Sequence, residues 1–182
     1  MTRTDLSSFN NDWYRPGGKI KLLIWYFCNV LFMKNGWIPF SGLKVGLLKL
    51  FGAKIGKGVL IKPCVNVKYP WKLEVGDHTW IGENVWIDNL GHVKIGANCC
   101  LSQGALLLCG NHDYKKSSFD LMVGKITLEE GVWIGAKCIV TGGVTAKSHA
   151  VLAAGSVASK DLEPYTIYRG SPAESIKKRE IA

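Results

Sequence analysis

Histidine is the side chain best suited to proton transfer near neutral pH, because its unperturbed pKa is about 6.5. The chain contains four: His78, His92, His112 and His149. Only His112 lies where the regular pattern of the sequence opens into a long loop, and a long loop on a rigid scaffold is a common place for a functional site. General-base chemistry at His112 is therefore one interpretation, and a histidine that only shapes a corner is the other.

Cysteine offers a second kind of chemistry, with less support. The six cysteines are Cys28, Cys64, Cys99, Cys100, Cys109 and Cys138. Several occupy positions that the pattern assigns to small interior residues, and no C-x-x-C pair occurs. Reduced thiols in a core are therefore favoured over disulfides, which suits a reducing cytoplasm.

The pattern that His112 interrupts is a repeat of six residues. Small or β-branched residues often follow the aliphatic position by four places, and glycine often follows it directly. No helix or twisted sheet has this period, which is typical of hexapeptide β-helices. The repeating aliphatic residues are Ile55, Ile61, Val67, Val75, Ile81, Ile87, Ile95, Leu101, Leu107, Leu128, Ile134, Val140, Ala146, Leu152 and Ala158.

Three six-residue units would make one turn of a triangular coil, with the aliphatic side chain inside and glycine at the corner. The repeat therefore predicts an all-β fold, a single-stranded left-handed parallel β-helix of about five coils. Two insertions, at 69–72 and 89–92, read as bulged corners. The repeat stops between Leu107 and Leu128, so residues 111–125 are expected to form an extended loop.

The ends of the chain differ from this central region, which we assign to residues 55–160. Residues 1–54 hold eight Lys or Arg and two Asp, hence +6 of the total +9, and are predicted to be helical. Two interpretations are open: a cap on the open end of the β-helix, or an interfacial segment near anionic lipid. Residues 161–182 are expected to close the other end with a short helix, 173–178. No nucleic-acid recognition motif accompanies the charge.

Several segments carry a family resemblance: the repeat itself, Leu50 to Gly56, Gly110-Asn111-His112, Gly131 to Gly135, Ala154 to Asp161 and Arg169 to Ala173. In these the chain resembles the hexapeptide-repeat O-acetyltransferases that act on maltose, galactosides and nodulation factors. It is most similar to the colanic-acid-type, WcaF-like exopolysaccharide acetyltransferases. The resemblance is specific for fold and acyl transfer, and it leaves the acceptor open.

The resemblance implies an acetyl-CoA-dependent O-acetyltransferase that acetylates a sugar hydroxyl in exopolysaccharide or capsule biosynthesis. His112 would be the general base for direct attack, since no neighbouring cysteine or serine has a nucleophile's context. Asp88 and Asn89 would lie on the acceptor side, where Asp88 could bind hydroxyls, orient His112, or merely bond its own backbone. Asp113 and Tyr114 are further acceptor candidates.

On the donor side, the resemblance implies that acetyl-CoA lies in a groove between adjacent β-helices. Its pantetheine would pass Trp133, Gly135, Ala136 and Ala154, while Ser159, Lys160 and Arg169 would meet the nucleotide end. Glu174 departs from the family pattern, because relatives commonly have a basic residue there. A shared groove implies a homotrimer. Its expected location is the cytoplasm, with the inner face of the membrane as the alternative.

Two other functions remain open at this stage. The chain could be a non-catalytic β-helix that serves as a scaffold or trimerisation module. It could also be a zinc enzyme of the γ-carbonic-anhydrase kind, which needs three histidine ligands. His78 and His92 lack the close partner spacing that such a site requires, so no metal is expected.

Overall fold

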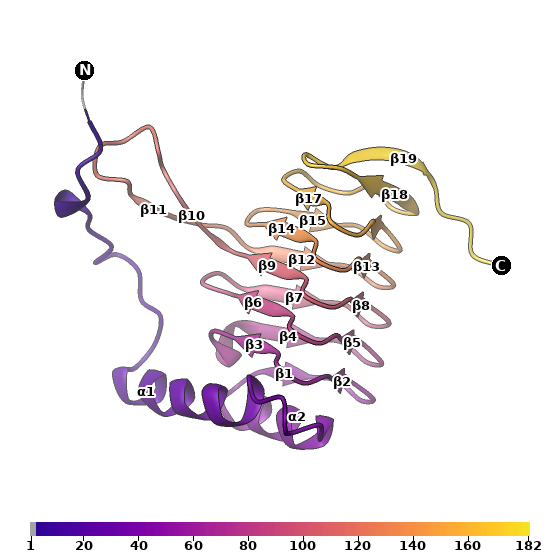
Figure 1. Ribbon diagram of the computed structural model, residues 1–182, viewed down its shortest axis with the longest axis horizontal. Helices are drawn as coiled ribbons and strands as arrows, with labels where there is room; N and C mark the ends of the chain where they lie inside the picture. The colour runs from indigo at the N-terminus through magenta and orange to yellow at the C-terminus, as the bar shows by residue number, and fades with distance from the viewer. Residues whose placement is uncertain (1–2) are drawn as a thin grey trace.

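The computed structural model describes residues 3–182, and its centre is a stack of short parallel strands that wind into a triangular prism (Figure 1). The strands form three sheets, here called A, B and C, one for each side of the prism. Sheet A contains β1 (Lys54–Ile55), β4 (Leu73–Val75), β7 (Val93–Ile95), β12 (Ile126–Leu128) and β15 (Thr145–Ala146). Sheet B contains β2 (Leu60–Ile61), β5 (Trp80–Ile81), β8 (Cys100–Leu101), β13 (Trp133–Ile134), β16 (Val151–Leu152), β18 (Thr166–Arg169) and β19 (Glu174–Lys178). Sheet C contains β3 (Asn66–Val67), β6 (Trp86–Asp88), β9 (Leu106–Leu108), β14 (Ile139–Thr141) and β17 (Val157–Ala158).

The predicted parallel β-helix is confirmed, with about six turns rather than five. The extra turn comes from β18, which continues sheet B in parallel with β16. Its sequence, Thr166 to Arg169, lies beyond the last residue of the six-residue repeat. A pattern based on that repeat therefore stops one turn early.

Every aliphatic residue of the predicted repeat is buried in one continuous core. In sheet B, for example, Ile61, Ile81 and Leu101 stand directly above one another in register. Each coil therefore covers the apolar interior of the next, which is how a solenoid stabilises strands only two or three residues long.

The outward faces of the three sheets differ in character. Sheet A carries polar side chains, namely Lys54, Glu74, Lys94, Thr127 and Thr145. Sheet B carries Leu60, Trp80, Cys100 and Trp133, and sheet C carries Trp86, Leu106, Ile139 and Val157. Two of the three sides of the prism are thus apolar, which is unusual for a surface that faces only water.

Helices cover the first coil (Figure 1). They are α1 (Lys19–Cys28), the π-helix η2 (Asn29–Met33) that continues it, and α2 (Ser41–Leu50). The indole Nε1–H of Trp25 donates to the carbonyl of Val67 at 2.9 Å, and Lys44 Nζ donates to the carbonyl of Lys62 at 2.9 Å. These bonds fix the helices to the first coil. Two 3₁₀ turns, η1 (Leu6–Ser8) and η3 (Pro70–Lys72), complete the helical elements.

The segment that interrupts the repeat is a two-stranded hairpin that leaves the prism after β9 (Figure 1). Its strands are β10 (Gly110–His112) and β11 (Leu121–Val123), with His112 opposite Leu121. The N-terminal arm runs beside this hairpin, and the backbone N–H of Asp5 donates to the carbonyl of Ser117 at 2.8 Å. The expected loop is therefore an ordered antiparallel arm.

The short helix predicted at residues 173–178 is wrong. Glu174–Lys178 forms β19, which pairs antiparallel with β18 so that Arg169 faces Glu174 and Thr166 faces Lys178. Without this strand the last rung of sheet B would leave its backbone groups unpaired at the edge. Pairing with the neighbouring strand β18 outweighs the helical propensity of the segment.

Candidate active site

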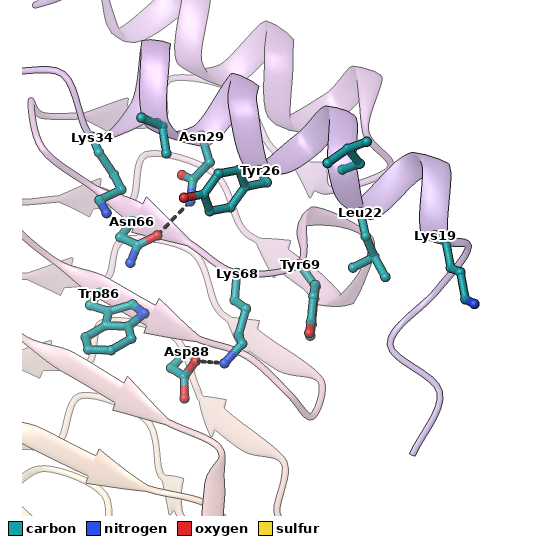
Figure 2. A pocket seen from close by; sticks show the side chains of 12 residues that line it. Lys19, Leu22, Tyr26, Asn29, Lys34, Asn66, Lys68, Tyr69, Trp86 and Asp88 are labelled. Atoms are coloured by element: carbon teal, nitrogen blue, oxygen red, sulfur yellow. Dashed lines mark hydrogen bonds and ion pairs between the residues drawn. The ribbon is translucent and has the colours of Figure 1, made fainter. Parts of the chain in front are cut away.

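A groove of about 590 Å³ lies between α1 and sheet C. Figure 2 shows that side chains from both elements point into it: Leu22 and Tyr26 from the helix, and Lys68, Trp86 and Asp88 from the coils. Its walls are mainly apolar, with a few polar groups, which is typical of a small-molecule site. Trp86 is 44 % exposed and so offers an aromatic side chain to a ligand.

Asp88 supplies the negative charge of this groove. It ends β6 and is buried, and its Oδ1 accepts a hydrogen bond from Lys68 Nζ at 2.8 Å (Figure 2). Lys68 directly follows β3. Since β3 pairs in register with β6, Lys68 lies one coil below Asp88. The ion pair holds the carboxylate in place, and among residues 3–182 its second oxygen, Oδ2, has no hydrogen-bond donor.

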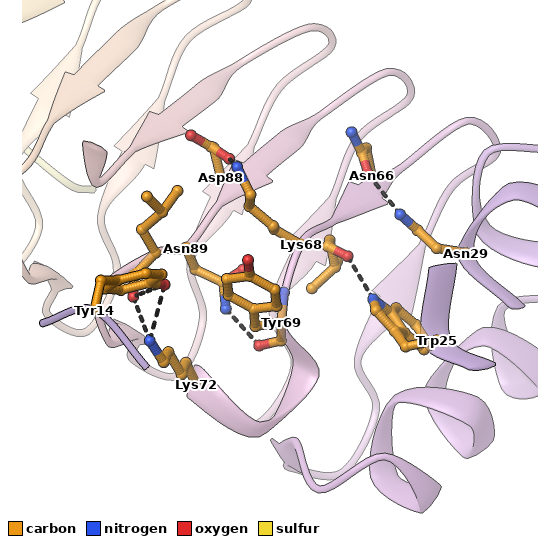
Figure 3. A network of polar contacts seen from close by, with 11 residues as sticks. Tyr14, Trp25, Asn29, Asn66, Lys68, Tyr69, Lys72, Asp88 and Asn89 are labelled. Atoms are coloured by element: carbon orange, nitrogen blue, oxygen red, sulfur yellow. Dashed lines mark hydrogen bonds and ion pairs between the residues drawn. The ribbon is translucent and has the colours of Figure 1, made fainter. Parts of the chain in front are cut away.

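Asn89 does not reach the groove surface, contrary to the prediction that it contacts the acceptor. It is fully buried, and its amide bridges to the corner one coil below. Nδ2 donates to the carbonyl of Tyr69 at 2.6 Å, and Oδ1 accepts from the N–H of Tyr69 at 2.9 Å (Figure 3). Asn89 therefore joins the two bulged corners that frame the groove.

The same corners anchor the N-terminal arm. Lys72 Nζ donates to the carbonyl of Leu90 at 2.6 Å and to Tyr14 Oη at 3.0 Å, while the Tyr14 hydroxyl donates to the same carbonyl at 2.8 Å (Figure 3). Burial lowers the pKa of Lys72 and raises the pKa of Tyr14. The arm thus leaves this anchor in a defined direction and reaches the hairpin.

His112 lies on the hairpin, half-buried between two phenylalanine rings. Its imidazole stacks on Phe119, with ring centroids 4.4 Å apart and an interplanar angle of 8°. The ring of Phe9, from the N-terminal arm, lies 5.7 Å away. Contact with these two rings restricts rotation of the imidazole, as a catalytic group requires.

A backbone carbonyl selects the tautomer of His112. Nδ1 lies 2.8 Å from the carbonyl oxygen of Phe119, and because that oxygen can only accept, Nδ1 carries the hydrogen. In the neutral imidazole Nε2 is then free to accept a proton. Phe119 adopts φ +52°, a left-handed conformation that is uncommon for a bulky residue and is often found at functional sites.

This contact answers the question of whether Asp88 orients His112. Nδ1 bonds to Phe119 and the Asp88 carboxylate bonds to Lys68, so within one chain the two do not act as a pair. The structure also does not bring Asp113 or Tyr114 to the groove. Asp113 accepts from the N–H of Lys115 at 3.1 Å within the hairpin, and Tyr114 is exposed near its tip.

The predicted donor residues lie on other parts of the prism. Trp133 projects from sheet B, where its Nε1–H donates to Ser102 Oγ at 2.9 Å. Gly135 and Ala136 follow β13, and Ala154 follows β16 one coil above. Ser159 and Lys160 follow β17 in sheet C, and Arg169 ends β18. These residues are not gathered around His112 of the same chain.

Gly135 also has a purely structural requirement. A Cβ atom at this position would lie 2.6 Å from the backbone nitrogen of Ala154 and 2.7 Å from the carbonyl oxygen of Leu152. Stacking of the coils therefore demands glycine here, whether or not a ligand approaches.

Lys68, Trp86 and Phe119 are site residues that sequence reasoning missed. Lys68 could have been found, because residues twenty apart in this region are in register between coils. Phe119 had no such signal, since it acts through its backbone carbonyl. Within residues 3–182, no three His, Cys, Asp or Glu side chains converge as they would around a metal ion.

Comparison with known proteins gives a consistent result. No protein-family model matches the chain. It is 36 % identical over 178 residues to a protein of Escherichia coli (strain K12) provisionally named colanic acid biosynthesis acetyltransferase WcaF, covering 96 % of this chain and 97 % of that protein. It is 27 % identical over 135 residues to the galactoside O-acetyltransferase of the same strain, covering 72 % of this chain and 66 % of that protein.

Two solved structures share the fold. Galactoside acetyltransferase in complex with coenzyme A aligns with a TM-score of 0.78 at 24 % identity, covering 88 % of this chain and 82 % of that one. A hexapeptide-repeat acetyltransferase of Vibrio cholerae O1 biovar eltor, in complex with acetyl coenzyme A, aligns with a TM-score of 0.72 at 24 % identity, covering 78 % and 79 %. Both support the left-handed β-helix that the repeat predicts.

Proposed function

The chain belongs to the hexapeptide-repeat acetyltransferases, and from that premise we propose that it transfers the acetyl group of acetyl-CoA to a saccharide hydroxyl in exopolysaccharide or capsule biosynthesis. The name of its E. coli relative, which refers to colanic acid biosynthesis, supports the polysaccharide context. The coenzyme A and acetyl coenzyme A in the two solved structures support the donor. The observation that carries the mechanism is the bond between His112 Nδ1 and the carbonyl of Phe119.

In this mechanism His112 is the general base. Its free Nε2 accepts the proton of the acceptor hydroxyl while the hydroxyl oxygen bonds to the thioester carbonyl carbon. The carbon–sulfur bond then breaks, and the imidazolium returns its proton to the departing sulfur. The Nδ1–H bond to Phe119 stabilises the positive charge that the ring carries between these steps.

The groove beside α1 is the proposed acceptor site. Trp86 offers a face on which the apolar side of a sugar ring can stack, and Asp88 can accept bonds from a pair of hydroxyls through its free oxygen. Lys68 keeps the carboxylate oriented through their 2.8 Å contact. Asp113 and Tyr114 would contact acceptor only from the hairpin of a neighbouring chain.

A homotrimer would bring the separated parts together. Sheets B and C present apolar outer faces while sheet A is polar, so a prism of this kind buries two faces by packing against two neighbours in a closed ring. The hairpin of one chain would then carry His112 to a donor groove on the next. In that groove Trp133, Gly135, Ala136 and Ala154 would face the pantetheine, and Ser159, Lys160 and Arg169 the nucleotide end.

Release of the CoA thiol from acetyl-CoA, measured with a panel of saccharides, tests the proposal. His112→Ala is expected to lower kcat by roughly 10²–10⁴. His92→Ala is the matched control, because His92 is an exposed corner histidine outside the proposed site, and it is expected to keep full activity. Unchanged turnover in His112→Ala would remove this residue from the mechanism, and failure to bind or turn over acetyl-CoA with any acceptor would refute the proposed transfer.

A further inference from the structure

The helices at the base of the prism are apolar on two opposite sides. Trp25, Asn29 and Met33 recur on the inner side of α1 and η2 and are buried against the first coil. Ile20, Ile24, Phe27 and Leu31 recur on the other side with the spacing of a helical stripe, and all four are at least half exposed. A surface helix normally places polar residues on its outer side, so this second stripe needs an explanation.

Neighbouring elements extend the stripe. Leu50, at the end of α2, is 78 % exposed, and Trp37, in the segment between η2 and α2, is 93 % exposed. We call these six residues, Ile20, Ile24, Phe27, Leu31, Trp37 and Leu50, the basal surface. None of them lines the proposed acceptor groove, so the function proposed above leaves them without a role.

The charge around the basal surface has one sign. No acidic residue occurs between Asp12 and Glu74. The basic residues of the helical region are Arg15, Lys19, Lys21, Lys34, Lys44 and Lys49, and of these only Lys44 is buried. An apolar stripe with basic flanks matches the surface of a bilayer that contains anionic lipid.

The helices are too short to cross a bilayer. No helix in residues 3–182 has the length and apolar character of a membrane span. Helix α1 and η2 together have 10 and 5 residues, which gives about 22 Å at a rise of about 1.5 Å per residue, against a hydrocarbon core of about 30 Å. Contact with lipid would therefore be parallel to the surface.

We propose that the basal surface binds peripherally to bilayers containing anionic phospholipid. Phe27 and the aliphatic stripe enter the boundary between headgroups and acyl chains, Trp37 lies at the interface, and the flanking lysines contact lipid phosphates. A second copy of this chain is a poorer occupant, because a symmetric pairing would bring the same basic flanks together without acidic partners.

Flotation with vesicles tests this inference. The protein is expected to float with vesicles of phosphatidylcholine mixed with phosphatidylglycerol, and to bind much less to phosphatidylcholine alone. The triple variant Ile24→Ser, Phe27→Ser, Leu31→Ser removes the stripe without touching buried residues and should weaken binding at least about tenfold. The matched control, Leu6→Ser, Ile176→Ser, Ile181→Ser, removes three equally exposed apolar residues elsewhere and should bind as the wild type does.

A charge variant gives an independent reading that does not depend on the folding of the triple variant. Lys34→Gln with Lys49→Gln should weaken binding about fivefold for each lysine removed, and high salt should have a similar effect. Three results would each overturn the inference: no flotation of the wild type, flotation of the triple variant equal to that of its matched control, or a triple variant that changes oligomeric state but not flotation. The last would show that another copy covers the stripe.

Discussion

Replacing Asn89 should reveal how much the framework of the acceptor groove depends on one buried amide. In Asn89→Ala the backbone N–H of Tyr69 loses the partner that holds it at 2.9 Å, which costs about 1–3 kcal/mol for an unsatisfied donor. The carbonyl of Tyr69 loses the bond from Nδ2 but keeps one from the N–H of Lys72 at 3.0 Å, a net loss of about 0.5–1.5 kcal/mol. The free energy of unfolding should therefore fall by about 1.5–4.5 kcal/mol in total.

Asn89→Asp tests separately the bond that residue 89 accepts from Tyr69 and the bond that it donates to Tyr69. A carboxylate still accepts from the Tyr69 N–H, but its other oxygen then faces the Tyr69 carbonyl with no proton between them. Burial and this repulsion raise the pKa of the new carboxyl above its unfolded value. The missing stability should therefore return as pH falls below that raised pKa, where the neutral acid donates in place of Nδ2, and be lost again as pH rises through it.

Urea unfolding followed by tryptophan fluorescence measures both effects, at one fixed protein concentration because the stability of an oligomer depends on it. Asn10→Ala is the control, since Asn10 also makes one donated and one accepted bond but on an exposed turn, and it should change stability by less than about 0.5 kcal/mol. An Asn89→Ala protein as stable as this control would refute the bridging role. An Asn89→Asp protein with no pH dependence relative to wild type would refute the assignment of donor and acceptor.

Three further expectations concern other parts of the molecule. Trp86→Ala should raise KM for the acceptor about two- to tenfold with a smaller change in kcat, as expected for lost stacking; initial-rate kinetics that show an unchanged KM would contradict this. Ile139→Asp, on the apolar face of sheet C, should dissociate the proposed trimer in analytical ultracentrifugation, whereas Thr127→Asp on the polar face of sheet A should leave it intact. Burial raises the pKa of Cys99 and of Cys109 to about 11, so below that pH both remain mainly protonated thiols. Neither should react with iodoacetamide at pH 8 in the native protein, although both should in urea, and the native rate should increase as pH rises toward 11.

The sequence is a good guide to the core and a poor one to the antiparallel pairings outside the repeat. The six-residue spacing is a local property, and each aliphatic residue that it marked is buried. Strand β19 and the β10–β11 hairpin depend on partners that local composition does not identify. Residues 173–178 are therefore predicted as a helix, although the free edge of the preceding strand, β18, decides their conformation.

The same distinction applies to the candidate site, where some residues could be predicted from the local sequence and others could not. His112 could be found because it breaks the repeat, whereas the carbonyl that selects its tautomer belongs to Phe119, a backbone group with no sequence signature. The insertion at 89–92 predicts that Asn89 contacts substrate, but a polar residue at such a corner can face either inward or outward. Only the position of Tyr69 one coil below shows that it faces inward.

The position of all the base helices at one end of the prism has a consequence for regulation (Figure 1). In a threefold ring of parallel prisms the three basal surfaces would lie in one plane, so the second and third contacts with a bilayer form at high effective concentration. Such avidity strengthens attachment by about 10²–10⁴ over a single contact. The fraction of protein bound to the membrane would then change sharply over a narrow range of anionic lipid content. Lipid composition would thus control how much of the enzyme works at the bilayer.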